Sequence, residues 1–375
     1  MNPPVWIVGA STRAAAFSAL RAGLSPRCAD LFADLDLESA AIAVRVDIHN
    51  YPSRLRSLER VQPAAPFLYT GGLENEPDLI DDLASCRELW GNPGNVLHAA
   101  RDPSRVAEVA RSNGFPVPKL AFDARGLPRD GSWLRKPRRS SGGVELTPLV
   151  DQDEPNQDGS IFFQERVPGL DASAIFLGDG GSARLVAVTR QLLGRPGAPF
   201  AYVGNVGPWP VSDTTRRLVE RLGGAVARGF GLRGLFGIDF KLSDGVPWLI
   251  EVNPRYTASV EVIEHALGIS LLADHARVFD SGASIRICEP RVQPSFVGKR
   301  VLFARRSLIA PDLSGFVTNC PERLPTIADI PQPGLSIRPG DPILTVFADG
   351  FTIEECESKL ARSAAFWDDR LHVQT

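Results

Sequence analysis

The stretch DFKLSDGVPWLIEVNPRYT, residues 239–257, places two carboxylates, an amide and a guanidinium in otherwise apolar, strand-like sequence. Side chains alternate between the faces of a strand, so Glu251 and Asn253 share one face and lie about 7 Å apart along it. Carboxylate and amide oxygens suit Mg²⁺, with Mn²⁺ as an alternative, and such a metal also binds substrate phosphates. We therefore predict Asp239, Glu251 and Asn253 as metal ligands and expect Arg255 to neutralise a transferred phosphoryl group.

The register of the two carboxylates depends on the turn between their strands. The Asp-Gly pair at 244–245 is a strong hairpin signal. A strict two-residue turn would pair Asp239 with Ile250, whereas a three-residue loop over 244–246 would pair Asp239 with Glu251. We prefer the second register, in which the facing carboxylates repel each other unless a cation lies between them. The alternative is a solvated hairpin face without a ligand.

A second group of residues lies in WLRKPRRSSGG, residues 133–143. Lys136 falls in a predicted strand and supplies a point charge for phosphate oxygens. The flexible loop after it, with Ser141, Gly142 and Gly143, can close its backbone N–H groups over the same phosphates. The alternative for this segment is an exposed hairpin tip.

A third group lies in FFQERVPGLDAS, where an apolar strand runs into Gln164, Glu165 and Val167. An extended segment of this kind can pair its backbone with the edge of an adenine ring. Asp171, six residues after Glu165, is placed to accept hydrogen bonds from ribose hydroxyls. The alternative is an ordinary strand and turn.

The composition is that of an ordinary globular protein of two to three domains. Of its 375 residues, 43% are hydrophobic and 23% charged, and the net charge is −3. Since nucleic-acid binders usually carry a basic surplus, we expect no nucleic-acid partner. The five cysteines are scattered and form no CxxC pair, which excludes a typical zinc site and fits a reducing, cytoplasmic compartment. No apolar run is long enough for a membrane span, and we see no signal peptide.

Alternating strands and helices predict a small parallel α/β domain over residues 1–92. After the first strand, Ser11, Thr12 and Arg13 open a helix, and a helix N-terminus after a strand can hold an anion. Helix capping is the alternative role for these three residues. The elements predicted in this domain are strands at 5–8, 41–46 and 66–69 and helices at 13–22, 55–60 and 77–86.

The remainder of the chain mixes helices with strands. Residues 194–199 are rich in Gly and Pro and are predicted to form a mobile loop. Gly204-Asn205 is predicted to be a turn that lines the cleft for the carboxylate substrate. The other predicted elements are helices at 102–113, 214–229, 260–267, 270–279 and 352–367, and strands at 133–137, 160–164, 172–177, 183–191, 299–303 and 342–347.

In this order the three groups of residues closely resemble the ATP-grasp superfamily over roughly residues 95–280, and GIDF followed by LIEVNPR is a specific match. The resemblance implies an α/β and α+β fold in which ATP lies between two lobes. Residues 1–92 look like the preATP-grasp α/β domain, and 93–290 look like the two-lobed core with an adenine hinge near 164–171. Residues 291–375 are similar to a small β-rich C-terminal lobe with a terminal helix.

The resemblance implies roles for individual residues. It makes Lys136 the phosphate lysine, residues 141–143 the mobile loop, Gln164, Glu165 and Val167 the adenine hinge, Asp171 the ribose contact, and Asp239, Glu251 and Asn253 the Mg²⁺ ligands.

The chain departs from the superfamily pattern in two places. A phosphate-contacting lysine is common where this chain has Asp102-Pro103, so Arg101 or Arg105 would have to substitute. A third glycine is common after the Gly-Gly pair, where this chain continues with Val-Glu, and this predicts a stiffer loop.

These features predict an ATP-dependent carboxylate–amine ligase that forms an amide through an acyl phosphate and releases ADP and phosphate. The predicted catalytic residues are Arg255, Lys136 and Arg190. Arg190 would hold the carboxylate substrate, with a surface ion pair as its alternative role.

The motifs GASTRAAAFSALRAG, GGLEN, YVGN and EVNPR resemble ligases of the tyramine–glutamate type, which serve cofactor biosynthesis. Two other classes stay open: an ATP-dependent small-molecule kinase and a non-catalytic nucleotide-binding protein. The expected partners are a small-molecule carboxylate and a small-molecule amine. The sequence does not fix the oligomeric state, and a homodimer is compatible with it.

Overall fold

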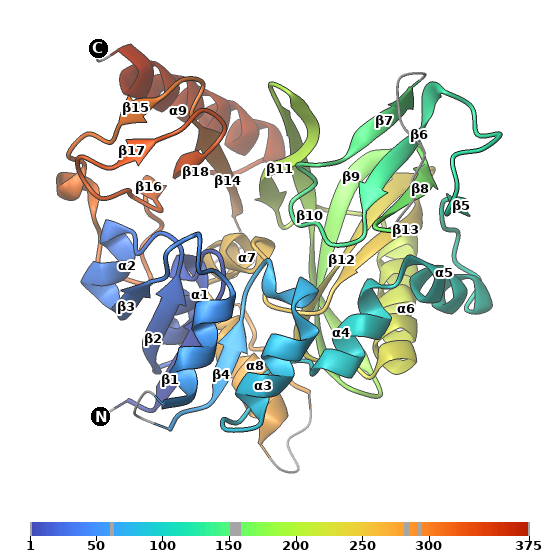
Figure 1. The fold of residues 1–375 in the computed structure, drawn as a ribbon, viewed down its shortest axis with the longest axis horizontal. Helices are drawn as coiled ribbons and strands as arrows, with labels where there is room; N and C mark the ends of the chain where they lie inside the picture. The colour runs from blue at the N-terminus through green and yellow to red at the C-terminus, as the bar shows by residue number, and fades with distance from the viewer. Residues whose placement is uncertain (1, 61–63, 151–158, 281–284, 291–294, 374–375) are drawn as a thin grey trace.

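The computed structural model describes residues 2–60, 64–150, 159–280, 285–290 and 295–373 (Figure 1). A four-stranded parallel sheet lies at the N-terminal end, a four-stranded antiparallel sheet lies in the middle of the chain, and an eight-stranded antiparallel sheet reaches into the C-terminal part. This architecture confirms the predicted α/β and α+β fold class. The predicted boundary after residue 290 borders residues 291–294, which lie outside the described part.

The N-terminal sheet has the order β3-β2-β1-β4, with all strands parallel. Its strands are β1 (Pro4–Val8), β2 (Ser25–Asp30), β3 (Ile42–Arg45) and β4 (Phe67–Tyr69), and its helices are α1 (Arg13–Arg21), α2 (Leu35–Ala40), α3 (Pro77–Ala84) and the 3₁₀ turns η1 (Ser53–Arg60) and η2 (Leu73–Asn75). Strand β2 escaped prediction because Pro26 and Arg27 interrupt its apolar pattern. Thr12 does not cap α1, since its hydroxyl and N–H both donate to Asp30, at 2.9 and 3.1 Å.

Two helices lead into the middle sheet. They are α4 (Gly94–Arg101), which was not predicted, and α5 (Pro103–Ser112), and the sheet contains β5 (Leu120–Ala121), β6 (Asp130–Pro137), β7 (Thr147–Val150) and β8 (Ile161–Glu165) in the order β5-β8-β6-β7. The Asp102 carboxylate caps α5 by accepting the N–H of Ser104 at 2.8 Å. This capping fixes the start of the helix that was predicted at 102–113.

The eight-stranded sheet has the order β13-β12-β9-β10-β11-β14-β18-β16. Its first strands are β9 (Leu170–Asp179), β10 (Ala183–Arg195), β11 (Ala198–Gly207), β12 (Arg233–Ser243) and β13 (Val246–Asn253), and its helices are α6 (Asp213–Phe230), α7 (Ser259–Leu267) and α8 (Leu271–Phe279). The rings of Phe176 and Phe236 stack with centroids 5.2 Å apart. A Cβ at Gly223 would lie 2.0 Å from the Phe176 ring, so α6 packs closely there only because it carries glycine.

The C-terminal strands continue the same sheet, because β11 pairs with β14. The elements here are β14 (Phe296–Phe303), β15 (Leu308–Ile309), η3 (Ser314–Phe316), β16 (Ile327–Ala328), β17 (Ser336–Ile337), β18 (Pro342–Gly350) and the long helix α9 (Ile353–Val373), which lies at the C-terminal end in Figure 1. One continuous sheet therefore connects strands β9 to β13 with the C-terminal strands β14, β18 and β16.

Two predictions between residues 194 and 205 are wrong. The loop predicted at 194–199 is a hairpin turn, since Arg195 of β10 pairs with Ala198 of β11. The turn predicted at Gly204-Asn205 lies inside β11, where the chain is irregular. A Cβ at Gly204 would lie 2.0 Å from the Lys299 carbonyl oxygen, so β14 can approach only a glycine.

Candidate functional site

The β12–β13 hairpin places Asp239 directly opposite Glu251, as the preferred register predicted. The route to this register differs from the prediction. The turn contains two residues, Asp244 and Gly245, with positive φ angles of 50° and 76°, which suit a type I′ turn. A bulge beside Ile250 then shifts the register by one residue. The three-residue loop was wrong, although the carboxylate pair it was meant to produce is present.

The surroundings of the pair shift the pKa values of its two carboxylates in opposite directions. Burial and the charge of Glu251 raise the pKa of Asp239 to about 7, although contacts from Ser173 and Gln191 oppose this. Burial would also raise the pKa of Glu251, but Arg101 and Lys136 lower it below its ordinary value. At neutral pH the pair therefore resists carrying two full charges until a further cation joins it.

Asn253 contacts both carboxylates. Its Nδ2 donates to Asp239 Oδ2 at 3.1 Å and to Glu251 Oε1 at 3.4 Å, and its Oδ1 accepts from Arg255 at 3.3 Å. In this arrangement the amide partly neutralises the carboxylates. To ligate a metal through oxygen, as predicted, the amide would have to rotate by half a turn.

The donor set at this hairpin fits a hard divalent cation. Two carboxylates and an amide face one another, and the described residues contain no cluster of three or more His, Cys, Asp or Glu side chains at metal-binding distances. A cation here would complete its shell with water and phosphate oxygens, which is the preference of Mg²⁺.

Lys136, on β6 of the middle sheet, lies near the carboxylate pair. It is 5% exposed, and its Nζ donates to Gln164 Oε1 at 2.9 Å. Burial lowers the pKa of Lys136, and the nearby Glu251 partly restores it. A buried ammonium beside a carboxylate pair is suited to holding a polyanionic ligand.

The Ser-Gly-Gly loop after β6 lies against β11. The Gly142 carbonyl accepts the Tyr202 N–H at 2.8 Å, and Gly143 has a φ of 67°. A Cβ at Gly143 would lie 2.4 Å from the Phe200 carbonyl oxygen. Ser141, Gly142 and Gly143 all line one large cavity together with Lys136, so the structure brings the loop and the lysine together.

The predicted adenine segment lines the same cavity, through Gln164, Glu165, Val167 and Asp171. Two of its acids have cationic partners: Asp171 binds Lys241 at 2.6 Å, and Glu165 lies 3.3 Å from Lys119. The Gln164 side chain holds Lys136, a role that its position in the segment did not reveal.

The two candidates for the missing phosphate lysine differ in position. Arg101 donates to the Ser140 carbonyl at 2.9 Å and lies 3.8 Å from Glu251. Arg105 is exposed on α5, and its N–H is bound to Asp102. Arg101 is therefore the arginine that contacts the residue before the Ser-Gly-Gly loop and lies near the carboxylate pair.

Arg255 lines the cavity and forms an ion pair with Glu74, a residue for which the sequence predicted no role in the site. Its Nη2 lies 2.7 Å from Glu74 Oε1, and the two side chains are 11% and 1% exposed. Its Nη1 donates to the Tyr256 carbonyl at 3.1 Å. Glu74 belongs to the GGLEN motif on η2, so a residue beside the N-terminal parallel sheet positions Arg255.

Arg190 does not enter the cavity. Its neighbours Thr189 and Gln191 line the cavity, and side chains alternate along a strand, so Arg190 points to the opposite face of β10. There it forms an ion pair with Glu357 on α9, with Nη1 3.0 Å from Oε1. The predicted substrate-holding role is corrected to the ion-pair alternative.

The cavity has a volume of about 740 Å³ and extends beyond the carboxylate pair. Ser11 and Arg13 line it, whereas Thr12 is bound to Asp30. Lys299 and Asp329, in the C-terminal part, also line the cavity and were not predicted as site residues. No periodic pattern marks these two residues, so only the folded chain brings them to the site.

Two lobes of antiparallel sheet that enclose a lysine and a carboxylate pair define an ATP-grasp architecture, and the comparisons with known proteins agree. The family model described as an ATP-grasp domain matches residues 100–259. An uncharacterized protein of Methanocaldococcus jannaschii is 30% identical over 292 residues, covering 75% of this chain and 68% of that protein. The chain belongs to the ATP-grasp superfamily.

Two further similarities indicate the range of the superfamily. The carbamoyl phosphate synthase large chain of Beutenbergia cavernae is 28% identical over 262 residues, which cover 60% of this chain and 22% of that protein. The crystal structure of L-amino acid ligase from Bacillus licheniformis matches with a TM-score of 0.67, 16% identity and 97% coverage of both chains. The second similarity shows a shared fold across nearly the whole chain.

We expect the stability of the metal-free protein to reveal the raised pKa of Asp239. The folded state holds this proton more tightly than the unfolded state, so the carboxyl favours folding at about pH 4 and this contribution is lost as the pH rises through about 7. Asp239→Asn should therefore gain stability relative to the parent protein, on the order of 2 kcal/mol more at pH ~8 than at pH ~5.

Urea unfolding in EDTA at the two pH values measures this difference. Asp244→Asn, at the exposed hairpin turn, is the matched control and should show no such trend. A stability difference between Asp239→Asn and the parent that does not change with pH would contradict the assignment.

Proposed function

We propose that the protein is an ATP-dependent ligase that joins a carboxylate to an amine through an acyl phosphate and releases ADP and phosphate. The observation that carries the proposal is the convergence of Lys136, Asp239 and Glu251 on one cavity in a chain of the ATP-grasp superfamily. The similarity in fold to an L-amino acid ligase over 97% of both chains supports the amide-forming reaction.

In this proposal the nucleotide lies between the middle sheet and the large sheet. Gln164, Glu165 and Val167 contact the adenine, and Asp171 contacts the ribose. Lys136 and the loop at 141–143 bind the phosphates, and Arg101 serves in place of the usual second lysine. The support is that all of these residues except Arg101 line one cavity, while Arg101 binds the base of the phosphate loop.

Asp239, Glu251 and, after rotation of its amide, Asn253 would hold Mg²⁺ here. The bound ion would neutralise phosphate charge and orient the terminal phosphoryl group. The rotation of Asn253 would also free Arg255 from the amide oxygen that it now contacts. The Arg255 guanidinium would then be available to stabilise negative charge on the transferred phosphoryl group and on the later oxyanion.

The chemistry requires two successive attacks. An oxygen of the carboxylate substrate attacks the γ-phosphate and releases ADP, and the nitrogen of the amine then attacks the acyl carbon and releases phosphate. Closure of the cavity around its substrates would protect the acyl phosphate from water between these steps. We place the reaction in cofactor biosynthesis, on the resemblance of GGLEN and EVNPR to tyramine–glutamate ligases.

A cytoplasmic location is part of the proposal, because the described cysteines are all free and ATP is the energy source. Among the described residues, no helix is both long and apolar enough to cross a membrane.

A screen of carboxylates and amines for ADP release, followed by mass spectrometry of the products, tests the proposal. We expect ADP release to require both an acid and an amine, and the product mass to equal their sum minus water. A product carrying a phosphate would indicate a kinase instead. Nucleotide binding without turnover on any pair would indicate a non-catalytic protein.

A further inference from the structure

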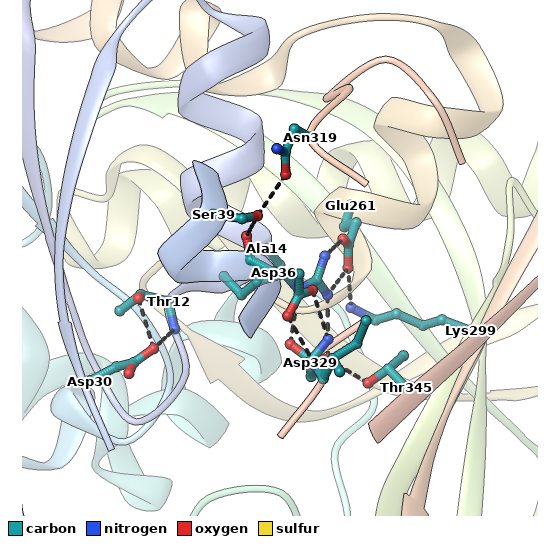
Figure 2. Close-up of polar contacts among 12 residues, drawn as sticks. Thr12, Ala14, Asp30, Asp36, Ser39, Glu261, Lys299, Asn319, Asp329 and Thr345 are labelled. Atoms are coloured by element: carbon teal, nitrogen blue, oxygen red, sulfur yellow. Dashed lines mark hydrogen bonds and ion pairs between the residues drawn. The ribbon is translucent and has the colours of Figure 1, made fainter. Parts of the chain in front are cut away.

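The end of the cavity farthest from the adenine segment is built by the N-terminal and C-terminal parts of the chain together. Figure 2 shows Asp36, Glu261, Lys299, Asp329 and Thr345 grouped there, on elements that are far apart in the sequence. Of these residues, Lys299, Asp329 and Thr345 line the cavity. None of them has a role in the nucleotide or metal site.

The large sheet connects this far end to the carboxylate pair. Gln191, which contacts Asp239, pairs with Asn205, and Asn205 pairs with Lys299. The next strand brings Thr345, and Asp329 follows the strand beyond it. Adjacent strands are about 5 Å apart, so the strands of Lys299 and Thr345 and the strand that precedes Asp329 lie ~10, ~15 and ~20 Å from Gln191 along the sheet. A substrate that reached it would need a polar group remote from its reacting end.

The far end carries more negative than positive charge. The Arg13 guanidinium forms a short ion pair with Glu261, binds Asp329 with Nε 2.9 Å from Oδ1, and lies 3.6 Å from Asp36. Lys299 Nζ lies 3.1 Å from Glu261. The cluster therefore contains two cations, Arg13 and Lys299, and three carboxylates, those of Asp36, Glu261 and Asp329.

Other titratable groups around this cluster do not reverse the imbalance. His265 beside Glu261 has a pKa lowered to about 4, chiefly by burial, and is neutral. Asp34 is also close, and burial together with Asp329 raises its pKa well above the ordinary value. The exposed Arg323 borders a separate small hollow on the other side of Arg13. The cluster as a whole keeps one carboxylate charge more than it has cations, and Asp329, which accepts hydrogen bonds from Arg13 and from the Thr345 hydroxyl, is its carboxylate on the cavity side.

Asp329 is the carboxylate that faces the cavity. Its side chain is 26% exposed, whereas those of Arg13 and Glu261 are 3% and 1% exposed. Its φ is 52°, a left-handed conformation that is uncommon for residues other than glycine. The Asp36 carboxylate holds this conformation by accepting the N–H groups of Asp329 and Ile330, at 2.9 and 3.0 Å.

Asn205 provides an independent indication of a ligand. The residue is fully buried, and its Oδ1 accepts from the Tyr202 hydroxyl at 2.6 Å. Its Nδ2 has no hydrogen-bond partner among the described residues, although Asn205 lines the cavity. A buried donor without a partner is destabilising, and an acceptor on a bound substrate would offset that cost.

We propose that the far end of the cavity binds a cationic group of the substrate, an ammonium or guanidinium, on the Asp329 carboxylate. Asn205 donates to an acceptor nearer the middle of the same molecule. This inference rests on the proposed ligase function and names its substrate class: a basic amino acid or a comparable amine, with its charge at the end remote from the reacting group.

The test is equilibrium binding of defined probes to the full chain in the presence of Mg²⁺ and ADP. The probes are L-lysine and L-arginine, each compared with an uncharged counterpart of similar length, L-norleucine and L-citrulline. We expect at least one basic probe to bind about tenfold or more tightly than its counterpart. Asp329→Asn should remove the preference without changing ADP affinity, whereas Asp341→Asn, in a surface ion pair with Arg338, should preserve it.

Equal binding of the charged and uncharged probes, or no binding of any of them, would overturn the inference, and neither result depends on a variant that folds. An Asp329→Asn protein that melts at lower temperature but keeps the preference would reduce Asp329 to a structural contact. Because binding is measured without turnover, the ligase proposal and the charge preference can fail separately. A protein that prefers the basic probes yet forms no amide would retain the site and lose the function.

Discussion

Replacing Glu251 with Gln should lower the rate of ADP release by about 10³-fold or more while leaving the fold intact. The substitution keeps the size of the side chain and removes the charge opposite Asp239. The proposed metal would lose an anionic ligand, and several kcal/mol of electrostatic stabilisation of the transferring phosphoryl group would go with it. A coupled assay with a magnesium titration, on the substrates found in the screen, measures the effect.

The matched control is Glu220→Gln on α6, where Glu220 forms an exposed ion pair with Arg216 at 3.1 Å. Exposed pairs of this kind contribute about 0–1 kcal/mol, so the control should keep parental activity and stability. The two variants separate the loss of a charge at the site from the loss of a charge elsewhere. If Glu251→Gln turned over at a rate near that of the parent, the metal assignment would be wrong.

The site was predictable where it depends on short, local patterns. The alternation in residues 248–253 placed Glu251 and Asn253 on one face, and the Asp-Gly pair located the hairpin. The bulge beside Ile250 was not predictable, because nothing in the sequence says which strand absorbs an extra residue. The correct pair followed from an incorrect loop because both choices shift the register by one.

When both faces of a strand are covered, the sequence does not show which face points into the cavity. In β10, Arg190 and Gln191 are equally plausible as site residues by sequence, but only one parity faces the cavity. The hairpin between β10 and β11 was also missed, since a Gly/Pro-rich segment is typical of both a loop and a turn. The three groups of predicted site residues line one cavity, as a set of continuous segments can. Their roles stay predictions, and helices α2 and α4 were not predicted.

Contacts between distant segments lay outside what the sequence could show. Glu74 lies in the 3₁₀ turn η2, Asp36 in the short helix α2 and Asp329 beside the short strand β16, without periodicity around them. Their significance comes from partners 181, 23 and 316 positions away along the chain: Arg255 for Glu74, and Arg13 for Asp36 and Asp329. A single sequence contains no signal for such pairs, and folding alone reveals them.

Arg255 should be essential for two separable reasons, and variants at Glu74 can separate them. Arg255→Met should lower the rate of ADP release by about 10²–10³-fold, because a guanidinium aimed at the developing phosphoryl charge is lost. The same change leaves the Glu74 carboxylate, which is 1% exposed, without its cation. An unpaired buried charge costs about 3–5 kcal/mol, so this variant should also unfold at lower urea concentration.

The double variant Glu74→Gln/Arg255→Met removes both charges, and replacing a whole buried pair is often close to neutral. Its stability should therefore return to within about 1 kcal/mol of the parent, as urea unfolding would show, while its activity should remain as low as that of Arg255→Met. If Arg255 had only a structural role, the double variant would give the opposite result, because restored folding would restore turnover. The comparison thus decides whether the N-terminal domain, through Glu74, holds in place a catalytic group or only a structural one.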